Sequence, residues 1–281
     1  MNSFPMTQLG GVEVSRMVAG SNWFLGFAHQ THTKGEWIKK YQTRRNIADV
    51  LKVFLGEGIN VAMSPLDPLM ADALHDAEQQ VGRKMYWICT PNWEMKEGDP
   101  SLDAARICFD RAAASGATFC WPHTCATDRL YDGLHRTIRH MEQICREIRQ
   151  RGLIPGLSTH LPEVIVTADR MKLDIASYIC IYNAAGFLMN IEIDWVQKVI
   201  HEARLPVTTI KPMAAGRLMP YVGLPFVWST LRDRDLVTVG TLTPDEAKEC
   251  IEISRAALEH RRADRKLQYT RSKQTLTEAA K

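Results

Sequence analysis

Short apolar segments alternate with longer amphipathic segments along this chain of 281 residues. The apolar segments are rich in β-branched and aromatic residues and end at glycine, proline or polar residues, which is typical of buried strands in a parallel sheet. The amphipathic segments carry apolar residues at helical spacing, as Ile47, Val50, Leu51, Phe54 and Leu55 do. A regular alternation of strand and helix predicts an α/β protein built on a parallel sheet.

Eight strand–helix units can be counted in the sequence, with predicted strands at 14–20, 59–63, 85–90, 117–121, 153–157, 174–182, 206–211 and 236–239. Eight such units predict a (β/α)8 TIM barrel that forms a single domain over residues 1–281. Residues 8–14, with the pair Gly10 and Gly11, predict an N-terminal β-hairpin that would close the bottom of the barrel.

Two further patterns predict helix boundaries and the end of the domain. Leu134, Ile138, Met141 and Ile144 form an apolar stripe that predicts one helix reaching Gly152, while the segment 124–128 and the loop after the first strand read as irregular. A Thr-Pro-Asp-Glu sequence at 243–246 is a capping box that predicts the start of the last helix. Residues from about 262 to 281 predict a polar C-terminal tail.

Composition and charge narrow the function classes. The chain is 45% hydrophobic and 24% charged with a net charge of +3, which is ordinary for a globular protein. No apolar run approaches the roughly 18 residues of a membrane span, and no secretory signal is present, so we expect a cytoplasmic protein without a membrane partner. The basic residues near the C-terminus lack interleaved aromatic residues, so we expect no nucleic-acid partner. Assembly into a homo-oligomer is compatible with the sequence.

Cysteine usage points to reduced thiols. The seven cysteines are an odd number and are scattered from Cys89 to Cys250. A disulfide framework is typical of much smaller secreted chains.

Titratable side chains follow several of the predicted strands. His29 follows the first strand, His123 the fourth and His160 the fifth, and Lys211 ends the seventh. The active site of a (β/α)8 barrel lies at the carboxyl ends of its strands, so we expect these side chains to face one mouth. The three histidines could act directly as acid/base groups, or they could bind a divalent metal such as Zn, Mn or Fe. Lys211, if buried, could form a Schiff base or stabilise an enolate.

Aromatic residues and one amide are candidates for binding a small-molecule substrate. Trp23 and Phe27 lie in the loop after the first strand, Trp93 and Trp121 lie near the ends of the third and fourth, and Asn183 follows the sixth. Aromatic walls with a few polar groups suit a sugar ring or another polar carbonyl compound. For each aromatic residue the alternative is a place in the hydrophobic core.

Five segments, taken together and in order, resemble the aldo-keto reductase superfamily: the opening 9–20, Gly-Ile-Asn at 58–60, Gly-Leu-Ser-Thr-His at 156–160, Lys-Pro-Met-Ala-Ala-Gly at 211–216, and Val-Gly-Thr-Leu-Thr-Pro-Asp-Glu at 239–246. The resemblance implies a (β/α)8 barrel that reduces carbonyl groups with NAD(P). It also implies a catalytic tetrad of Asp, Tyr, Lys and His.

The tetrad does not carry over to this sequence. The Asp position falls at Met63, the Tyr position falls in the segment 65–68, which has no tyrosine, and the Lys position falls at Pro91. His123 approximates the fourth member. Since the general acid is missing, we do not expect ordinary carbonyl reduction.

The cofactor side differs as well. The resemblance implies a basic residue and an asparagine where this chain has Glu246 and Cys250. A carboxylate repels the 2′-phosphate of NADP, so we expect NAD(P) less than a divalent metal.

These observations favour a non-redox lyase, isomerase or hydrolase that acts on a polar carbonyl or sugar-like substrate. Its chemistry would come from His123, His160 and Lys211, with His29, His123 and His160 as the alternative metal ligands. Two other hypotheses stay open: a divergent NAD(P)-dependent aldo-keto oxidoreductase, and a barrel that binds a ligand without catalysis.

Overall fold

The computed structural model describes residues 4–95, 102–273 and 276. Its parallel strands are β3 (Met17–Gly20), β4 (Val61–Ser64), β5 (Tyr86–Cys89), β6 (Phe119–Cys120), β9 (Ile154–Pro155), β10 (Leu157–Ser158), β11 (Tyr178–Ile181), β12 (Val207–Ile210) and β13 (Leu236–Gly240). They are ordered β10-β11-β12-β13-β3-β4-β5-β6-β9 in one sheet. Because β9 and β10 are halves of one strand broken at Gly156, the sheet returns to its starting strand and forms the predicted barrel.

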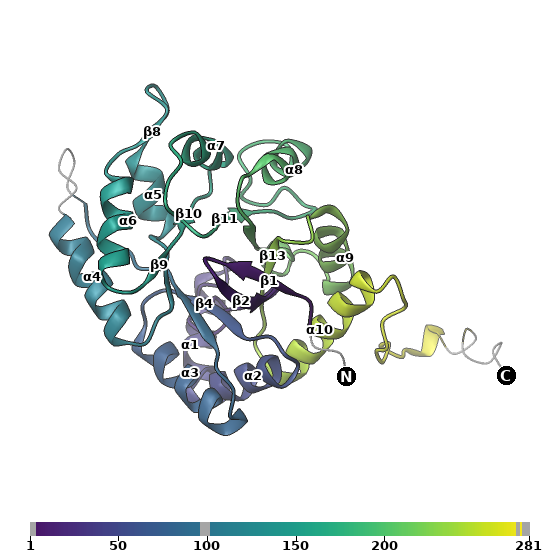
Figure 1. The fold of residues 1–281 in the computed structure, drawn as a ribbon. Helices are drawn as coiled ribbons and strands as arrows, with labels where there is room; N and C mark the ends of the chain where they lie inside the picture. Colours follow the sequence, from purple (N-terminus) through teal and green to yellow (C-terminus); the bar gives the residue numbers. More distant parts are fainter. Residues whose placement is uncertain (1–3, 96–101, 274–275, 277–281) are drawn as a thin grey trace.

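Helices surround this barrel on the outside (Figure 1). They are α1 (His32–Tyr41), α2 (Arg44–Gly56), α3 (Pro68–Val81), α4 (Leu102–Ala114), α5 (Thr124–Leu130), α6 (Met141–Gln150), α7 (Pro162–Arg170), α8 (Ile193–Glu202), α9 (Pro220–Thr230) and α10 (Pro244–Leu258). The predicted capping box is present, since the Thr243 side chain accepts a hydrogen bond from the backbone N–H of Glu246. In the part of the chain that the structure describes, no helix is long and apolar enough to cross a bilayer.

The predicted hairpin covers the amino-terminal end of the barrel. Strands β1 (Met6–Leu9) and β2 (Val12–Ser15) pair antiparallel and lie across the barrel in Figure 1. Gly10 and Gly11 both have positive φ angles, of 55° and 87°, which the tight turn requires. Leu9 and Val14 are buried in the same cluster as side chains of the barrel interior. These two side chains therefore cover the barrel interior at this end.

One interior residue explains why the fifth strand is broken. Trp121 is fully buried inside the barrel, where its ring packs edge-on against Phe119. A Cβ atom added to Gly156 would lie 2.4 Å from Nε1 of Trp121, which is far inside van der Waals contact. Glycine at 156 thus makes room for the indole, and the strand is interrupted there.

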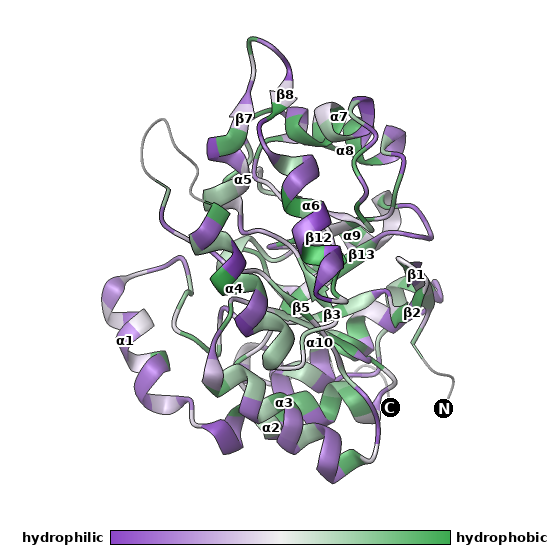
Figure 2. Ribbon diagram, turned by 60° about the vertical axis from the view of Figure 1, so that its left-hand side comes forward, coloured by the Kyte–Doolittle hydropathy of each residue, from purple (hydrophilic) through white to green (hydrophobic). Residues whose placement is uncertain are grey.

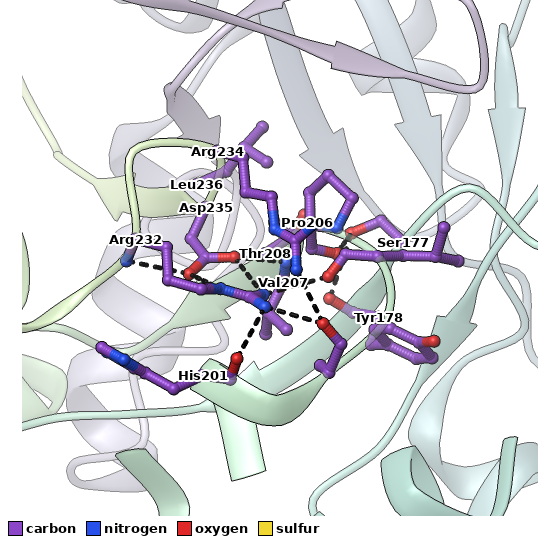
Figure 3. A network of polar contacts seen from close by, with 12 residues as sticks. Ser177, Tyr178, His201, Pro206, Val207, Thr208, Arg232, Arg234, Asp235 and Leu236 are labelled. Atoms are coloured by element: carbon purple, nitrogen blue, oxygen red, sulfur yellow. Dashed lines mark hydrogen bonds and ion pairs between the residues drawn. The ribbon is translucent and has the colours of Figure 1, made fainter. Parts of the chain in front are cut away.

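A buried ion pair fixes the start of two neighbouring strands (Figure 3). The fully buried carboxylate of Asp235 accepts hydrogen bonds from the Arg232 guanidinium at 2.7 and 2.8 Å and from the backbone N–H of Val207 at 2.8 Å. The same guanidinium donates to the carbonyls of Ala203 and Leu205. Since β12 and β13 begin here, this network stabilises the end of the barrel away from the strand tips.

The helix predicted through Leu134 and Ile138 is wrong in its first part. Residues 131–138 form an antiparallel hairpin of β7 (Tyr131–Asp132) and β8 (Thr137–Ile138), which projects from the body in Figures 1 and 2. Leu134 is 88% exposed at its tip. A turn forms here instead of a helix because the Asp132 carboxylate accepts a hydrogen bond from the backbone N–H of His135. Arg136 also has a positive φ angle, which a helix does not allow.

Two helices lie where irregular loops were expected. Helix α1 begins after Thr31, whose side chain accepts a hydrogen bond from the Lys34 N–H, and α5 begins after His123. Only Gly35 and Ile38 are buried in α1, so it lacks the apolar stripe that marks a helix in a sequence. Figure 2 shows α1 as a largely hydrophilic helix at the periphery.

The predicted polar tail begins after α10. Residues 261–270 have no regular structure, and a short 3-10 helix spans Arg271–Lys273. Apart from residue 276, the rest of the predicted tail lies outside the described residues.

Candidate active site

A large cavity opens at the carboxyl ends of the strands. It has a volume of about 1160 Å³. Side chains that follow seven strands border it: Ser21, Ser64, Thr90, His123, His160, Lys211 and Thr241. This is the end of the barrel where (β/α)8 enzymes carry their active sites. The volume exceeds the range of roughly 300–1,000 Å³ that is usual for small-ligand pockets.

The structure brings the predicted basic residues together. His29, His123, His160 and Lys211 all line the cavity. Burial and then the charge of Lys211 lower the pKa of His29 and of His123. Burial, followed by the charges of Lys211, His123 and His29, lowers the pKa of His160 to about 4. The three imidazoles are therefore neutral near pH 7.

Lys211 occupies an unusual backbone position directly after β12. Its φ angle is +61°, a conformation that residues other than glycine rarely adopt. Within the described residues its amine makes neither an ion pair nor a hydrogen bond, and burial lowers its pKa to about 8. Strained backbone at a cavity wall is typical of functional sites. At pH 7 Lys211 is mostly an ammonium ion, but it loses its proton far more easily than an exposed lysine.

The helix that follows β6 fixes the protonation of His123. This residue is the N-cap of α5, and its Nδ1 accepts a hydrogen bond of 3.2 Å from the backbone N–H of Cys125. An accepting Nδ1 carries no proton, so the neutral ring carries its proton on Nε2. His123 is consequently a hydrogen-bond donor at Nε2.

Asp128 joins α5 to the end of β10. Its carboxylate accepts hydrogen bonds from the hydroxyl groups of Thr124 at 2.6 Å and Thr159 at 2.5 Å, and from the backbone N–H of His160 at 3.1 Å. These contacts hold the segments that carry His123 and His160 in a fixed relation. The ring of His160 makes no hydrogen bond of its own within the described residues, which leaves its nitrogens free for a ligand.

Two strand-tip loops contact each other across the mouth of the cavity. The Gln30 side chain donates a 2.9 Å hydrogen bond to the carbonyl of Ala215, and the Arg217 guanidinium donates to the carbonyl of His29 at 3.3 Å. The guanidinium also lies 4.0 Å from the centroid of the Phe187 ring. The loops after β3, β11 and β12 are thus held together, and this contact positions His29.

The aromatic candidates divide into two groups. Trp23 and Phe27 line the cavity as expected. Trp93 and Trp121 are not among its lining residues. Trp93 is buried and packs edge-on against Phe109, and Trp121 fills the barrel interior, so both occupy the alternative place in the core.

Asn183 also lies away from the cavity lining. It is fully buried after β11, and its carboxamide oxygen accepts hydrogen bonds from the backbone N–H groups of Ala185 and Phe187. Its Nδ2 donates to the Phe187 carbonyl. These three bonds give the loop its shape and leave the amide without a free donor pair for a substrate.

The predicted metal ligands share the cavity without forming a ligand set. Across residues 4–95, 102–273 and 276, no group of three or more His, Cys, Asp or Glu side chains is placed to hold a metal ion. His29, His123 and His160 nevertheless all line the cavity. Their contacts fit direct acid/base or hydrogen-bonding roles.

One observation concerns the tyrosine of the tetrad that the family resemblance implies. All seven tyrosines lie in the described part of the chain, and none of them lines the cavity. Met63 and Ser64 stand at the tip of β4, and the lysine of the cavity comes from β12. The phenol that the family resemblance implies is absent from the cavity wall.

The cavity continues past β13 to the first turn of α10. The hydroxyl groups of Thr238 and Thr241 are buried there without a hydrogen-bond partner among the described residues. These groups and the available volume fit a nucleotide. The carboxylates of Glu246 and Glu249 face the same space, however, and disfavour an additional phosphate group.

Sequence comparisons give no family for this chain. No protein-family model matches it, and no curated protein matches it. Solved structures do match. A candidate aldo-keto reductase from Pseudomonas aeruginosa is 18% identical, with a TM-score of 0.64 over 90% of this chain and 95% of that one. An aldo/keto reductase from Klebsiella pneumoniae, in complex with NADP and acetate, is 12% identical, with a TM-score of 0.57 over 99% and 95% of the two chains.

The likeness extends beyond reductases. A truncated 3-deoxy-D-arabino-heptulosonate 7-phosphate synthase from Thermotoga maritima is 10% identical, with a TM-score of 0.57 over 92% of this chain and 93% of that one. At these identities the comparison shows the fold, which is the (β/α)8 barrel found in aldo-keto reductases. Because a synthase is as similar as a reductase, the fold does not decide the chemistry.

Proposed function

We propose that this barrel is a non-redox enzyme, a lyase or isomerase that removes a proton next to the carbonyl group of a small polar substrate. The proposal rests on two groups that line one cavity: the neutral imidazole of His160 and the amine of Lys211. Among the residues that the structure describes, neither group has a hydrogen-bond partner. The first group can accept a proton while the second stabilises negative charge.

His160 is the proposed base. Its ring lines the cavity, and it is neutral at physiological pH because its pKa is lowered to about 4. The imidazole takes the proton from the α-carbon, and the C–H electron pair forms the carbon–carbon double bond of an enolate. In an isomerase the imidazolium then returns the proton to the neighbouring carbon. In a lyase the enolate collapses to a carbon–carbon double bond, the leaving group departs from the β-carbon with the bonding electrons, and the imidazolium gives its proton to that leaving group.

Lys211 and His123 are the proposed partners of the enolate oxygen. The Lys211 ammonium lies in a partly buried position without a competing carboxylate, and the neutral ring of His123 donates from Nε2. Donors that are fixed before the reaction stabilise developing charge most effectively in a site shielded from water. Trp23 and Phe27 supply the apolar wall beside them.

Exchange of substrate protons with solvent tests this proposal directly. The protein is incubated in D2O, without a nicotinamide, with dihydroxyacetone, hydroxypyruvate or pyruvate, and loss of the α-proton signal is followed by NMR. We expect catalysed exchange that falls about 100-fold or more in Lys211→Met and in His160→Phe. Lys266→Met, an exposed lysine outside the cavity, is the matched control and should leave the rate unchanged.

Two results would contradict the proposal. Absence of exchange with every probe removes the proton-abstraction chemistry. Exchange that disappears after treatment with EDTA and returns with Zn²⁺ or Mn²⁺ assigns the chemistry to a metal instead of to the two side chains.

A second candidate is a divergent NAD(P)-dependent oxidoreductase. It is favoured by the extension of the cavity to α10 and by the unpaired hydroxyl groups of Thr238 and Thr241. Lys211 would then donate a proton to the carbonyl oxygen as the substrate is reduced. Saturable quenching of tryptophan fluorescence by NADH or NADPH, weakened in Thr241→Val, would support this function, and a linear response up to millimolar concentrations would exclude it.

A further inference from the structure

The acidic side chains of the cavity wall already have partners. The Asp128 carboxylate accepts the three hydrogen bonds described above, and the Glu246 carboxylate accepts one of 2.7 Å from the backbone N–H of Leu242. The Glu249 carboxylate forms an ion pair of 3.3 Å with Arg265. Each of these acids therefore accepts at least one hydrogen bond or forms an ion pair within the described residues.

The cationic side chains of the same wall, in contrast, have no partner among the described residues. Arg111 on α4, Arg129 on α5 and Lys211 after β12 all line the cavity. Over the described ranges, none of the three takes part in an ion pair or donates a side-chain hydrogen bond, whereas Arg106, which also lies on α4, does both. Arg111 and Arg129 are exposed to solvent and Lys211 is partly buried, so three positive charges without a partner among the described residues face the cavity and are complementary to an anion.

We propose that the substrate carries an anionic group, a carboxylate or a phosphate, which Arg129 and Arg111 bind on the α4–α5 side of the cavity while the carbonyl group lies at Lys211. This inference rests on the proposed function for the position of the carbonyl group. It adds the class of substrate, which is an anionic carbonyl compound.

The choice of arginine fits this role. A guanidinium presents paired N–H groups in a planar fork that matches the two oxygens of a carboxylate or phosphate. Arg129 follows Asp128 in α5, and Asp128 is fixed to the segment that carries His160. An anion on Arg129 would therefore be held at a defined place relative to the proposed base.

The binding step is tested first, without turnover. Inorganic phosphate and pyruvate are titrated into the protein by calorimetry, at constant ionic strength. We expect binding of both, weakened about tenfold in Arg129→Gln, because a hydrogen bond to a charged group contributes roughly 1.5–3 kcal/mol. Arg146→Gln, an exposed arginine outside this cavity, should bind as the wild type does. Absence of binding, or equal binding by Arg129→Gln, would overturn the inference.

The exchange step then separates this inference from the function on which it rests. Dihydroxyacetone, which is neutral, is compared with its phosphate ester and with hydroxypyruvate in D2O. We expect a kcat/KM at least about tenfold higher for an anionic probe, and loss of that advantage in Arg129→Gln with the neutral probe unaffected. Equal rates for neutral and anionic probes would overturn the inference while the proposed function stands. Binding of the anions without any exchange would contradict the proposed function and leave the anion-binding inference standing.

Discussion

The amine of Lys211 should lose its proton at a pH far below that of an ordinary lysine, because it is buried without a carboxylate partner among the described residues. Burial lowers its pKa from 10.5 to about 8. At pH 7 about 9% of the amine would then be unprotonated, against about 0.03% for an exposed lysine, which is roughly a 300-fold difference in reactive amine. The experiment varies the pH from 6 to 11 and follows the protonation of this amine.

Competitive labelling measures this directly. Trace acetic anhydride is added at each pH, and the acetylated fraction of each lysine peptide is measured by mass spectrometry. We expect the labelling of Lys211 to rise with a midpoint near pH 8, well below the ordinary lysine value of about 10.5. Limited access to the cavity lowers the plateau for Lys211 but does not move its midpoint. A Lys211 midpoint at the ordinary lysine value, about 10.5, would refute the reasoning.

The same shift predicts how Lys211 affects stability. The folded state binds this proton less tightly than the unfolded state, so the wild-type protein gains stability as pH rises from about 8 to 10.5. Lys211→Met should therefore be more stable than wild type below pH 8, and the difference should vanish above 10.5. Denaturant unfolding at several pH values checks this sign.

Two substitutions test the architecture. In denaturant unfolding, Gly156→Ala should destabilise the protein by about 1–3 kcal/mol, because the new Cβ would overlap the Trp121 indole. Gly56→Ala is the control: its Cβ meets nothing within 4 Å, so it should be neutral or slightly stabilising. Asp235→Asn should lower the free energy of unfolding by about 3–5 kcal/mol in the same assay, because it leaves a buried guanidinium without its counter-ion. The exposed Asp233→Asn is the control and should leave the free energy of unfolding almost unchanged. Equal losses in the two variants would contradict the stabilising role of the network in Figure 3.

The barrel could be predicted because its strands are buried on both faces and its helices on one, and both patterns are visible in the sequence. The prediction failed where local contacts override periodicity. Leu134 has helical spacing to Ile138, but the turn formed by Asp132 and His135 places it at the exposed tip of a hairpin. Helix α1 was missed for the opposite reason, since it buries too few side chains to leave a pattern.

The basic cluster could be predicted because a closed barrel brings all strand ends to one mouth. His160 and Lys211 follow strands directly, so their positions followed from the strand assignment alone. The place of Trp121 stayed open in the sequence because a residue at a strand end points either to the mouth or into the barrel, and packing against Gly156 decides which. The contacts of Asp128 required α5, which the sequence did not reveal.

The pH dependence of kcat/KM for proton exchange, measured without a nicotinamide, tests the central claim most directly. Exchange requires neutral His160 and protonated Lys211, so the account predicts a bell-shaped profile that rises near pH 4 and falls near pH 8. A rate that instead rises through pH 8 would show that the free amine of Lys211 is required, and absence of exchange at every pH would contradict proton abstraction by this site.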